Sequence, residues 1–188
     1  LWIDTGSVNV YLCRDSGGFT LIDAAMPGKA DLIFARLAEW GGGPTDLKRI
    51  VITHADLDHA GSAAELQARS GATVHAGAAT AALLVEGRSP RHMPPPVQFL
   101  IDHFVRYKRV DRAAIRPLDD GDELPVLGGL RVLAAPGHTP EQTAFYSPAA
   151  GVLFAADALN TRDDRLQLTP RRITADQAAA ERSAIQLL

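Results

Sequence analysis

The sequence has 188 residues, of which 46% are hydrophobic and 22% charged, and its formal net charge is −3. This composition excludes a disordered chain, and the scattered Lys and Arg residues argue against a nucleic-acid partner. The apolar runs fall short of the roughly 20 residues that a membrane-spanning helix needs, so we expect no membrane partner. The length fits a single domain over residues 1–188. Because Cys13 has no second cysteine to pair with, we expect a cytoplasmic location.

The first half of the chain predicts a hairpin followed by alternating helices and strands. Asp15-Ser16-Gly17-Gly18 is a turn signal between two β-rich runs, and Gly71 stands where a left-handed helix cap belongs. The expected strands cover 8–12, 19–22, 49–53 and 72–75, and the expected helices cover 29–40 and 60–70. The two strands that flank the second helix predict a right-handed parallel crossover, and therefore an α/β fold.

A Pro-rich stretch interrupts this pattern in the middle of the chain. Residues 89–96 hold four prolines and exclude a continuous helix or a central strand. We expect an excursion at about 86–117, with a helix at 97–107, that covers the site as a lid, seals the core or forms a dimer contact. The oligomeric state is left open. Beyond the excursion, strands are expected at 130–134, 143–146 and 152–155, and a final helix at 175–188.

Four potential metal ligands follow the expected strand at 49–53 within six residues: His54, Asp56, Asp58 and His59. Side chains at the carboxyl end of a strand point into the crevice in which open α/β sheets place their ligands. Two imidazoles and two carboxylates suit divalent zinc, manganese or iron. The alternative is that Asp58 caps the following helix and that both histidines are solvated.

Two more candidate ligands follow expected strands. His138 stands in a Pro-Gly-His-Thr run after the strand at 130–134, and Asp157 follows the strand at 152–155. A single His or Asp at a strand end is more often a cap or a turn residue than a ligand. Together with the cluster at 54–59, however, the two residues predict one metal centre that is built from three strand ends.

The order and spacing of these residues resemble the metallo-β-lactamase superfamily of metallohydrolases. Its motif is His-x-His-x-Asp-His after a strand, then a His in a Pro-Gly-His-Thr context, an Asp after another strand and a last His. The resemblance covers nearly the whole chain and includes the opening hairpin, with Asn9, Tyr11 and the strand end at 21–23. It implies a four-layer αββα sandwich as the fold, truncated at its C-terminus.

The resemblance also implies a role for each candidate residue. His54, Asp56 and His138 would hold one metal ion, Asp58 and His59 would hold a second, and Asp157 would bridge the two. The implied cofactors are two divalent ions, zinc in the first place, with iron or manganese as alternatives. A water shared by two metals about 3.5–4 Å apart is a hydroxide near neutral pH, and Asp58 would orient it as the catalytic residue.

Two features depart from the family pattern. Asp56 stands where the family usually has its second His, and no fitting last His follows Asp157. A carboxylate is a harder ligand than imidazole and adds negative charge, so we expect the first metal site to accept iron or manganese more readily. Neither end of the sequence resembles a natural terminus, so two alternatives stay open: the last ligand His lies beyond residue 188, or the second metal site lacks one ligand.

The leading functional hypothesis is a metal-dependent hydrolase of a small-molecule substrate. In the glyoxalase-like branch that the chain resembles, a metal-bridging hydroxide cleaves an ester, a thioester or a lactone. One alternative is a di-iron redox protein, because flavodi-iron members of the family carry a carboxylate at the position of Asp56. The other alternative is a degenerate metal-binding domain without catalytic activity.

Three histidines lie outside the motif. We expect His75, in the strand at 72–75, to be structural. His92 and His103 fall in the Pro-rich excursion, where we expect them to be solvated or to line a substrate entrance. The substitution His92→Ala is therefore expected to have little effect.

Overall fold

The computed structural model describes residues 1–162 and 164–188, and its strands form two main sheets. The first sheet has the order β1-β2-β3-β4-β5-β6, with β1 (Trp2–Asp4), β2 (Asn9–Asp15), β3 (Gly18–Ile22), β4 (Leu47–Ile52), β5 (Thr73–Gly77) and β6 (Ile115–Leu118). The second has the order β10-β9-β8-β7, with β7 (Glu123–Leu124), β8 (Leu130–Ala134), β9 (Thr143–Ser147) and β10 (Val152–Phe154). A small hairpin pairs β11 (Asn160–Arg162) with β12 (Arg165–Gln167).

The helices connect and flank these strands. They are α1 (Ala30–Glu39), α2 (Leu57–Ala60), α3 (Ala63–Ser70), α4 (Ala78–Glu86), α5 (Pro95–Phe104) and α6 (Gln177–Leu187), with short 3₁₀ helices at Pro44–Asp46, Arg112–Ala114, Ala156–Ala158 and Arg171–Ile173. Within residues 1–162 and 164–188, no helix combines the length and the apolar character that crossing a bilayer requires.

The first sheet changes from antiparallel to parallel pairing at β3. Turns at residues 5–8 and after Asp15 reverse the chain twice, so β1, β2 and β3 pair antiparallel, whereas β3, β4, β5 and β6 run parallel. The connection from β4 to β5 through α3 is the expected parallel crossover. The helix α3 ends at Gly71, which has a φ of 73° and is the predicted left-handed cap. Parallel strands present their carboxyl ends at one edge of the sheet, and ligands bind at that edge in open α/β sheets.

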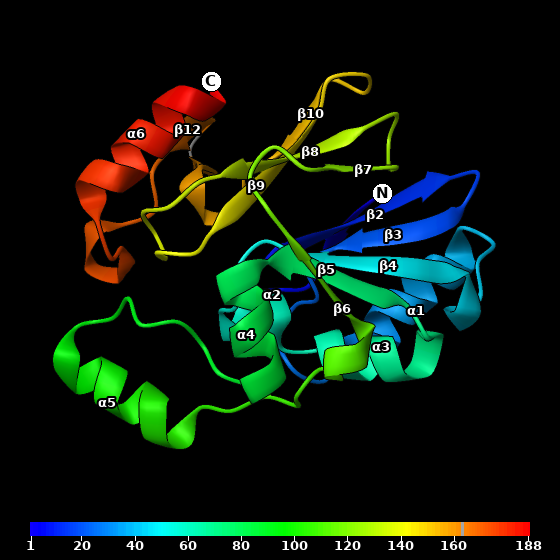
Figure 1. Ribbon diagram of the computed structural model, residues 1–188, viewed down its shortest axis with the longest axis horizontal. Coiled ribbons are helices and arrows are strands. Elements are labelled where there is room, and N and C mark those ends of the chain that lie inside the picture. The colour runs from blue at the N-terminus through cyan, green and yellow to red at the C-terminus, as the bar shows by residue number, and fades with distance from the viewer. Residues whose placement is uncertain (163) are drawn as a thin grey trace.

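The two sheets face each other and carry helices on their outer faces (Figure 1). The apolar layer between the sheets takes side chains from both of them, such as Val51 of β4 and Phe145 of β9. The helices α1, α3 and α4 cover the first sheet, where Ile33 and Leu84 are fully buried. The helix α6 lies on the outer side of the second sheet, and its Leu187 packs against a small apolar cluster there. The architecture is the four-layer αββα sandwich that the resemblance implies.

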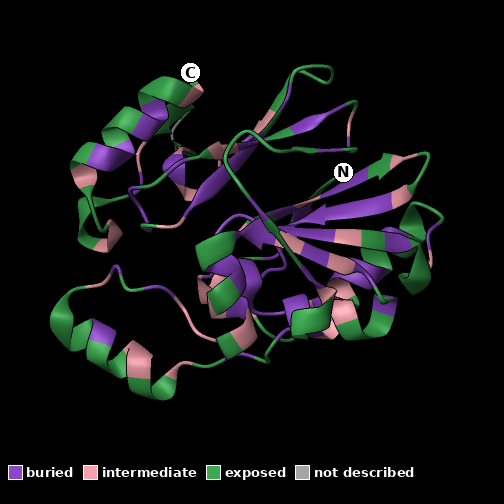
Figure 2. Ribbon diagram, viewed as in Figure 1, coloured by how far each residue is buried: buried purple, intermediate pink, exposed green. Residues whose placement is uncertain are grey.

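The Pro-rich segment connects α4 to β6. It runs from residue 87, after α4, to residue 114, before β6, and it returns to the core at Tyr107 and Val110, which belong to the buried cluster under the first sheet. Within this segment α5 stands away from the sheets and is largely exposed (Figure 1, Figure 2). It ends at Phe104 rather than at Tyr107, whose buried hydroxyl donates to the carbonyl oxygen of Ala55 at 3.2 Å. The role of the segment as a lid stays a prediction.

The elements that the sequence does not predict are short or lack a periodic pattern. The helix α4 consists almost entirely of Ala, Leu and Val, so no polar face marks it as amphipathic. The strands β1, β6, β7, β11 and β12 have two to four residues each, too few for an alternating pattern to be recognised.

Candidate metal centre

The candidate ligands come from three loops that begin where β4, β8 and β10 end. His54 follows β4, and Asp56 precedes the short helix α2, which carries His59. His138 lies in the loop after β8, and Asp157 lies in the 3₁₀ helix after β10. Strand ends of both sheets therefore contribute to the same site, as the sequence predicts.

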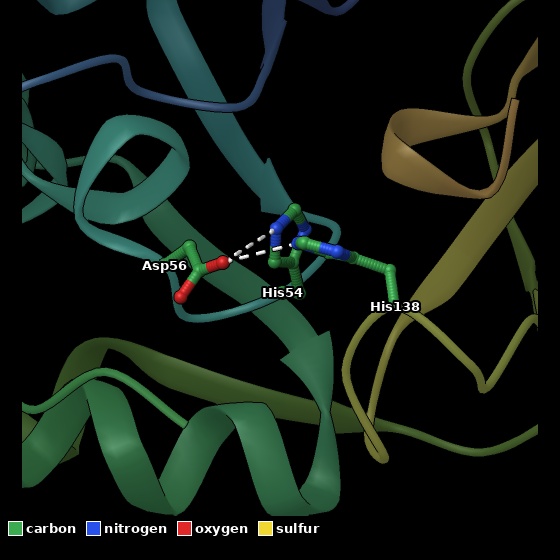
Figure 3. Close-up of side chains that lie close together, drawn as sticks. All are labelled: His54, Asp56 and His138. Atoms are coloured by element: carbon green, nitrogen blue, oxygen red, sulfur yellow. Dashed lines mark hydrogen bonds and ion pairs between the residues drawn. The ribbon is translucent and has the colours of Figure 1, made fainter. Parts of the chain in front are cut away.

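His54, Asp56 and His138 form the first group, in which the donor atoms lie within 4.8 Å of one another. Oδ2 of Asp56 lies 3.2 Å from Nε2 of His138 and 3.6 Å from Nε2 of His54. Figure 3 shows one oxygen of Asp56 turned towards both imidazoles. Two nitrogens and one oxygen that converge in this way can hold a divalent cation.

His54, His59 and Asp157 form a second group within the same 4.8 Å limit. Oδ1 of Asp157 lies 3.4 Å from Nε2 of His59, and Oδ2 lies 3.4 Å from Nε2 of His138. The two oxygens of this carboxylate therefore face histidines that belong to different groups. A carboxylate in such a position can bind one cation through each oxygen.

Two of the imidazoles lack a hydrogen-bond partner on the nitrogen that faces the site. His54 and His59 are 0% and 4% exposed, and neither Nε2 meets hydrogen-bond geometry with any residue that the structure describes. A buried polar atom without a partner costs roughly 1–3 kcal/mol. Bound cations would satisfy both nitrogens, so the donor set fits the divalent metals that the resemblance implies.

A buried carboxylate behind the site orients two of its histidines. Asp23, directly after β3, accepts hydrogen bonds from the backbone N–H and the hydroxyl of Thr53 at 2.9 and 3.0 Å, and lies 2.8 Å from Nδ1 of His59. The hydroxyl of Thr53 also lies 3.0 Å from Nδ1 of His54. An imidazole that donates through Nδ1 presents Nε2 to a metal. The sequence alone does not predict this role of Asp23, although its place at a strand end is a usable signal.

The charges of the site shift the ionisation of its members. Burial by itself raises the pKa of Asp56, but the hydrogen bond from His138 and the nearby imidazole of His54 outweigh it and hold this pKa well below its usual range. Burial of Asp157 is likewise outweighed by the close contact with His59 and by the charge of that imidazole, so the pKa of Asp157 is lowered. Burial lowers the pKa of His59, but the carboxylates of Asp23 and Asp157 raise it well above its usual value. Both carboxylates are therefore ionised at neutral pH, as metal ligands must be.

Comparison with known proteins agrees with this geometry. Residues 3–188 match the family model of the metallo-beta-lactamase superfamily. The chain belongs to this superfamily. The structure is similar to that of a solved B3 metallo-beta-lactamase with an active-site glutamic acid, with 26% sequence identity and a TM-score of 0.72. The similarity covers 97% of this chain and 67% of the chain of that enzyme.

Relatives with curated sequences include proteins with and without a named activity. The uncharacterized protein YobT of Bacillus subtilis (strain 168) is 33% identical over 158 residues, which are 82% of this chain and 63% of YobT. A hydroxyacylglutathione hydrolase of Fuscovulum blasticum is 34% identical over 151 residues, which are 79% of this chain and 47% of that protein. The chain thus spans about half to two thirds of the length of these relatives.

Most of the residues that match the superfamily motif lie together, and Asp58 does not join them. The two groups contain His54, Asp56, His59, His138 and Asp157. Asp58 belongs to neither group and lies half-buried in the first turn of α2. It caps no helix, because the N-caps of α2 and α3 are Asp56 and Ser62, so the capping alternative is wrong. The role of each residue as a ligand, and of Asp58 in catalysis, stays a prediction.

The expectation that His92 is solvated is wrong. Its side chain is 1% exposed, and its Nε2 lies 3.3 Å from Oδ2 of Asp56. His103 is exposed on α5, and His75 lies in β5 with its Nε2 2.9 Å from the hydroxyl of Thr73, as a structural residue would. No sequence signal connects His92 with the motif, because the contact depends on how the Pro-rich segment folds back.

A cavity of about 470 Å³ lies against the second group. Asp23, His59 and Asp157 line it, together with residues such as Tyr11 and Asn160. Its volume and its mixture of polar and apolar side chains suit a small molecule.

Proposed function

We propose that this member of the superfamily is a metal-dependent hydrolase that cleaves a thioester, an ester or a lactone of a small molecule. The observation that carries the proposal is Asp157, whose two oxygens lie 3.4 Å from His59 and from His138. A carboxylate between two groups of imidazoles is the arrangement that a pair of cations needs. Zinc is the first candidate for both ions, with iron or manganese as alternatives.

The residues of the chain prepare the site for this chemistry. A bound pair of divalent cations would supply a hydroxide at neutral pH and polarise the acyl oxygen of the substrate. Asp23 keeps the proton of His59 on Nδ1, so that Nε2 is available as a ligand. We assign Asp58, in the first turn of α2, the orientation of the attacking water. The cavity beside Asp157 would receive the substrate.

Relatives of the chain support this choice of substrates. A hydroxyacylglutathione hydrolase that matches most of this chain acts, by its name, on an acylated thiol, which makes a thioester the first class to test. Solved neighbours named as metallo-beta-lactamases make a β-lactam a second class. One of them has an active-site glutamic acid, so an active-site carboxylate of this kind occurs within the superfamily.

A substrate panel with defined metals tests the proposal. The full-length protein is loaded separately with zinc, manganese or iron and assayed against thioesters, esters, lactones and β-lactams. We expect turnover of a thioester or an ester, and a loss of about 100-fold or more in kcat/KM in Asp157→Ala. His103→Ala, on the exposed helix α5, is the matched control and should retain full activity.

Two results would refute the proposed hydrolase activity. A protein that holds iron, shows a visible absorption band and hydrolyses no member of the panel would favour the di-iron redox alternative. A protein that binds none of the three metals tightly would favour the degenerate domain.

A further inference from the structure

His92 lies against the ligand that departs from the family pattern. Its side chain is 1% exposed, and its Nε2 lies 3.3 Å from Oδ2 of Asp56. The ring of His92 also lies beside the ring of His138, with 4.9 Å between the centroids. Neither ring nitrogen meets hydrogen-bond geometry with a described residue, although the carbonyl group of Pro90 lies near the ring. A buried imidazole without hydrogen bonds is costly, which points to a partner in the metal centre.

The backbone that carries His92 is held by a buried glutamine. Oε1 of Gln98, in α5, accepts hydrogen bonds from the backbone N–H groups of His92 and Met93 at 3.1 Å each. Nε2 of Gln98 donates to Asp102 at 3.0 Å, and Asp102 forms an ion pair with Arg91 at 2.7 Å. Although much of α5 is exposed (Figure 2), the helix therefore anchors the loop that places His92 at the site.

The contact of His92 with the metal centre is made through Asp56. The donor atoms of His54, Asp56 and His138 lie within 4.8 Å of one another, and His92 is not a member of that group. Its Nε2 approaches the carboxylate oxygen instead. This arrangement suits a group that acts on a ligand better than it suits a further ligand.

The charge of Asp56 explains why such a neighbour is useful. Where the superfamily usually has a neutral imidazole, this chain has the carboxylate of Asp56, which is only 14% exposed. The carboxylate of Asp157 is close by, because both carboxylates contact Nε2 of His138. Additional negative charge in a buried site is costly to desolvate and weakens the electron withdrawal by a bound cation. A hydrogen bond donated to the carboxylate disperses part of that charge and fixes the direction of its oxygens.

We propose that His92 is a positioning residue, which donates its Nε2–H to the carboxylate of Asp56 and lets Asp56 replace the imidazole that the superfamily usually has there. The inference rests on the proposed function only in taking Asp56 as a metal ligand. The effect of His92 on metal binding therefore depends on the carboxylate at position 56.

Cobalt(II) binding tests this pair without any substrate. The dissociation constant is measured by competition with a chelator, and the visible spectrum of the bound ion is recorded, for the full-length protein, His92→Ala and His92→Gln. We expect binding to weaken about 10- to 100-fold in His92→Ala. In His92→Gln we expect most of the affinity to return, because the amide N–H can donate to Asp56. The control His103→Ala, on exposed α5, should bind cobalt as the unaltered protein does.

Combining His92→Ala with Asp56→His distinguishes a specific interaction between His92 and Asp56 from a general packing role of His92. In the Asp56→His background we expect His92→Ala to change cobalt affinity by no more than about threefold, because no carboxylate needs the donor. An equal loss in both backgrounds, or no loss in either, would overturn the proposal.

Thermal unfolding of the metal-free variants checks that each variant is folded before its cobalt affinity is compared. If His92→Ala does not fold, His92→Phe replaces it, because the Phe ring fills the space of the imidazole without a hydrogen-bond donor. The same changes in cobalt affinity then support or overturn the proposal. A protein that shows the expected cobalt affinities but hydrolyses nothing would refute the proposed function and leave this inference standing.

Discussion

Replacing Asp23 by Asn tests how a buried carboxylate controls the candidate ligand His59. The substitution keeps the size and shape of the side chain, and Asn tolerates the left-handed backbone of this residue (φ 61°) as well as Asp does. Asp23 is 4% exposed, so water cannot take over a lost partner. The substitution therefore removes the negative charge and changes the pattern of donors and acceptors, while the volume of the side chain stays the same.

The contacts of Asp23 set the size of the effect. Oδ1 accepts from the backbone N–H of Thr53 at 2.9 Å, and Oδ2 lies 2.8 Å from Nδ1 of His59. If the oxygen of Asn keeps the bond to Thr53, its NH₂ group faces His59, which must then carry its proton on Nε2 and cannot bind a metal there. A lost hydrogen bond to a charged group costs about 1.5–3 kcal/mol. At about 1.4 kcal/mol per factor of ten, one metal ion should bind about 10- to 150-fold more weakly.

Stepwise zinc binding, measured by competition with a chromophoric chelator, checks this value. We expect one ion to bind more weakly in Asp23→Asn and kcat/KM to fall in parallel. Asp4→Asn is the control, because Asp4 is exposed and accepts from the backbone N–H of Gly6 at 2.8 Å, away from the candidate ligands. Two zinc ions bound as tightly in Asp23→Asn as in the unaltered protein would refute the argument about the proton on His59.

Three further substitutions test the bridge, a backbone contact and a buried base. Asp157→Ala removes both oxygens between the two groups, so elemental analysis should find fewer tightly bound ions per chain, and an unchanged metal content would exclude bridging. Gly137→Ala puts a Cβ 2.3 Å from Cα of Ala180 at a φ of 148°, so urea unfolding should show a loss of about 3 kcal/mol, whereas a neutral effect would mean that α6 shifts freely. Burial lowers the pKa of His75 from 6.5 to about 4, so between these pH values the unfolded chain binds a proton that the folded chain does not, and stability falls as the pH falls. His75→Asn should remove about 1 kcal/mol of that loss, given the partial exposure of the ring, and equal pH profiles would contradict this.

Several local features of the fold could be predicted because neighbouring residues decide them. The turn residues after Asp15 predict the β2–β3 hairpin, and the position of Gly71 predicts the end of α3. The end of α5 could not be predicted, because Tyr107 is held by a hydrogen bond to Ala55 that no periodic pattern contains. The tertiary contact, and not the helix propensity of the segment, ends the helix there.

The positions of the candidate metal ligands could be predicted from neighbouring residues, because His54, Asp56 and His59 follow a strand in a spacing that turn chemistry does not explain. The residues that contact these candidate ligands could be identified only from the folded chain. Asp23 reaches His59, and His92 reaches Asp56, through loops whose paths depend on the packing of remote segments. Hydrogen bonds between such segments leave no regular spacing in the sequence, so the three-dimensional fold alone reveals these neighbours of the candidate ligands.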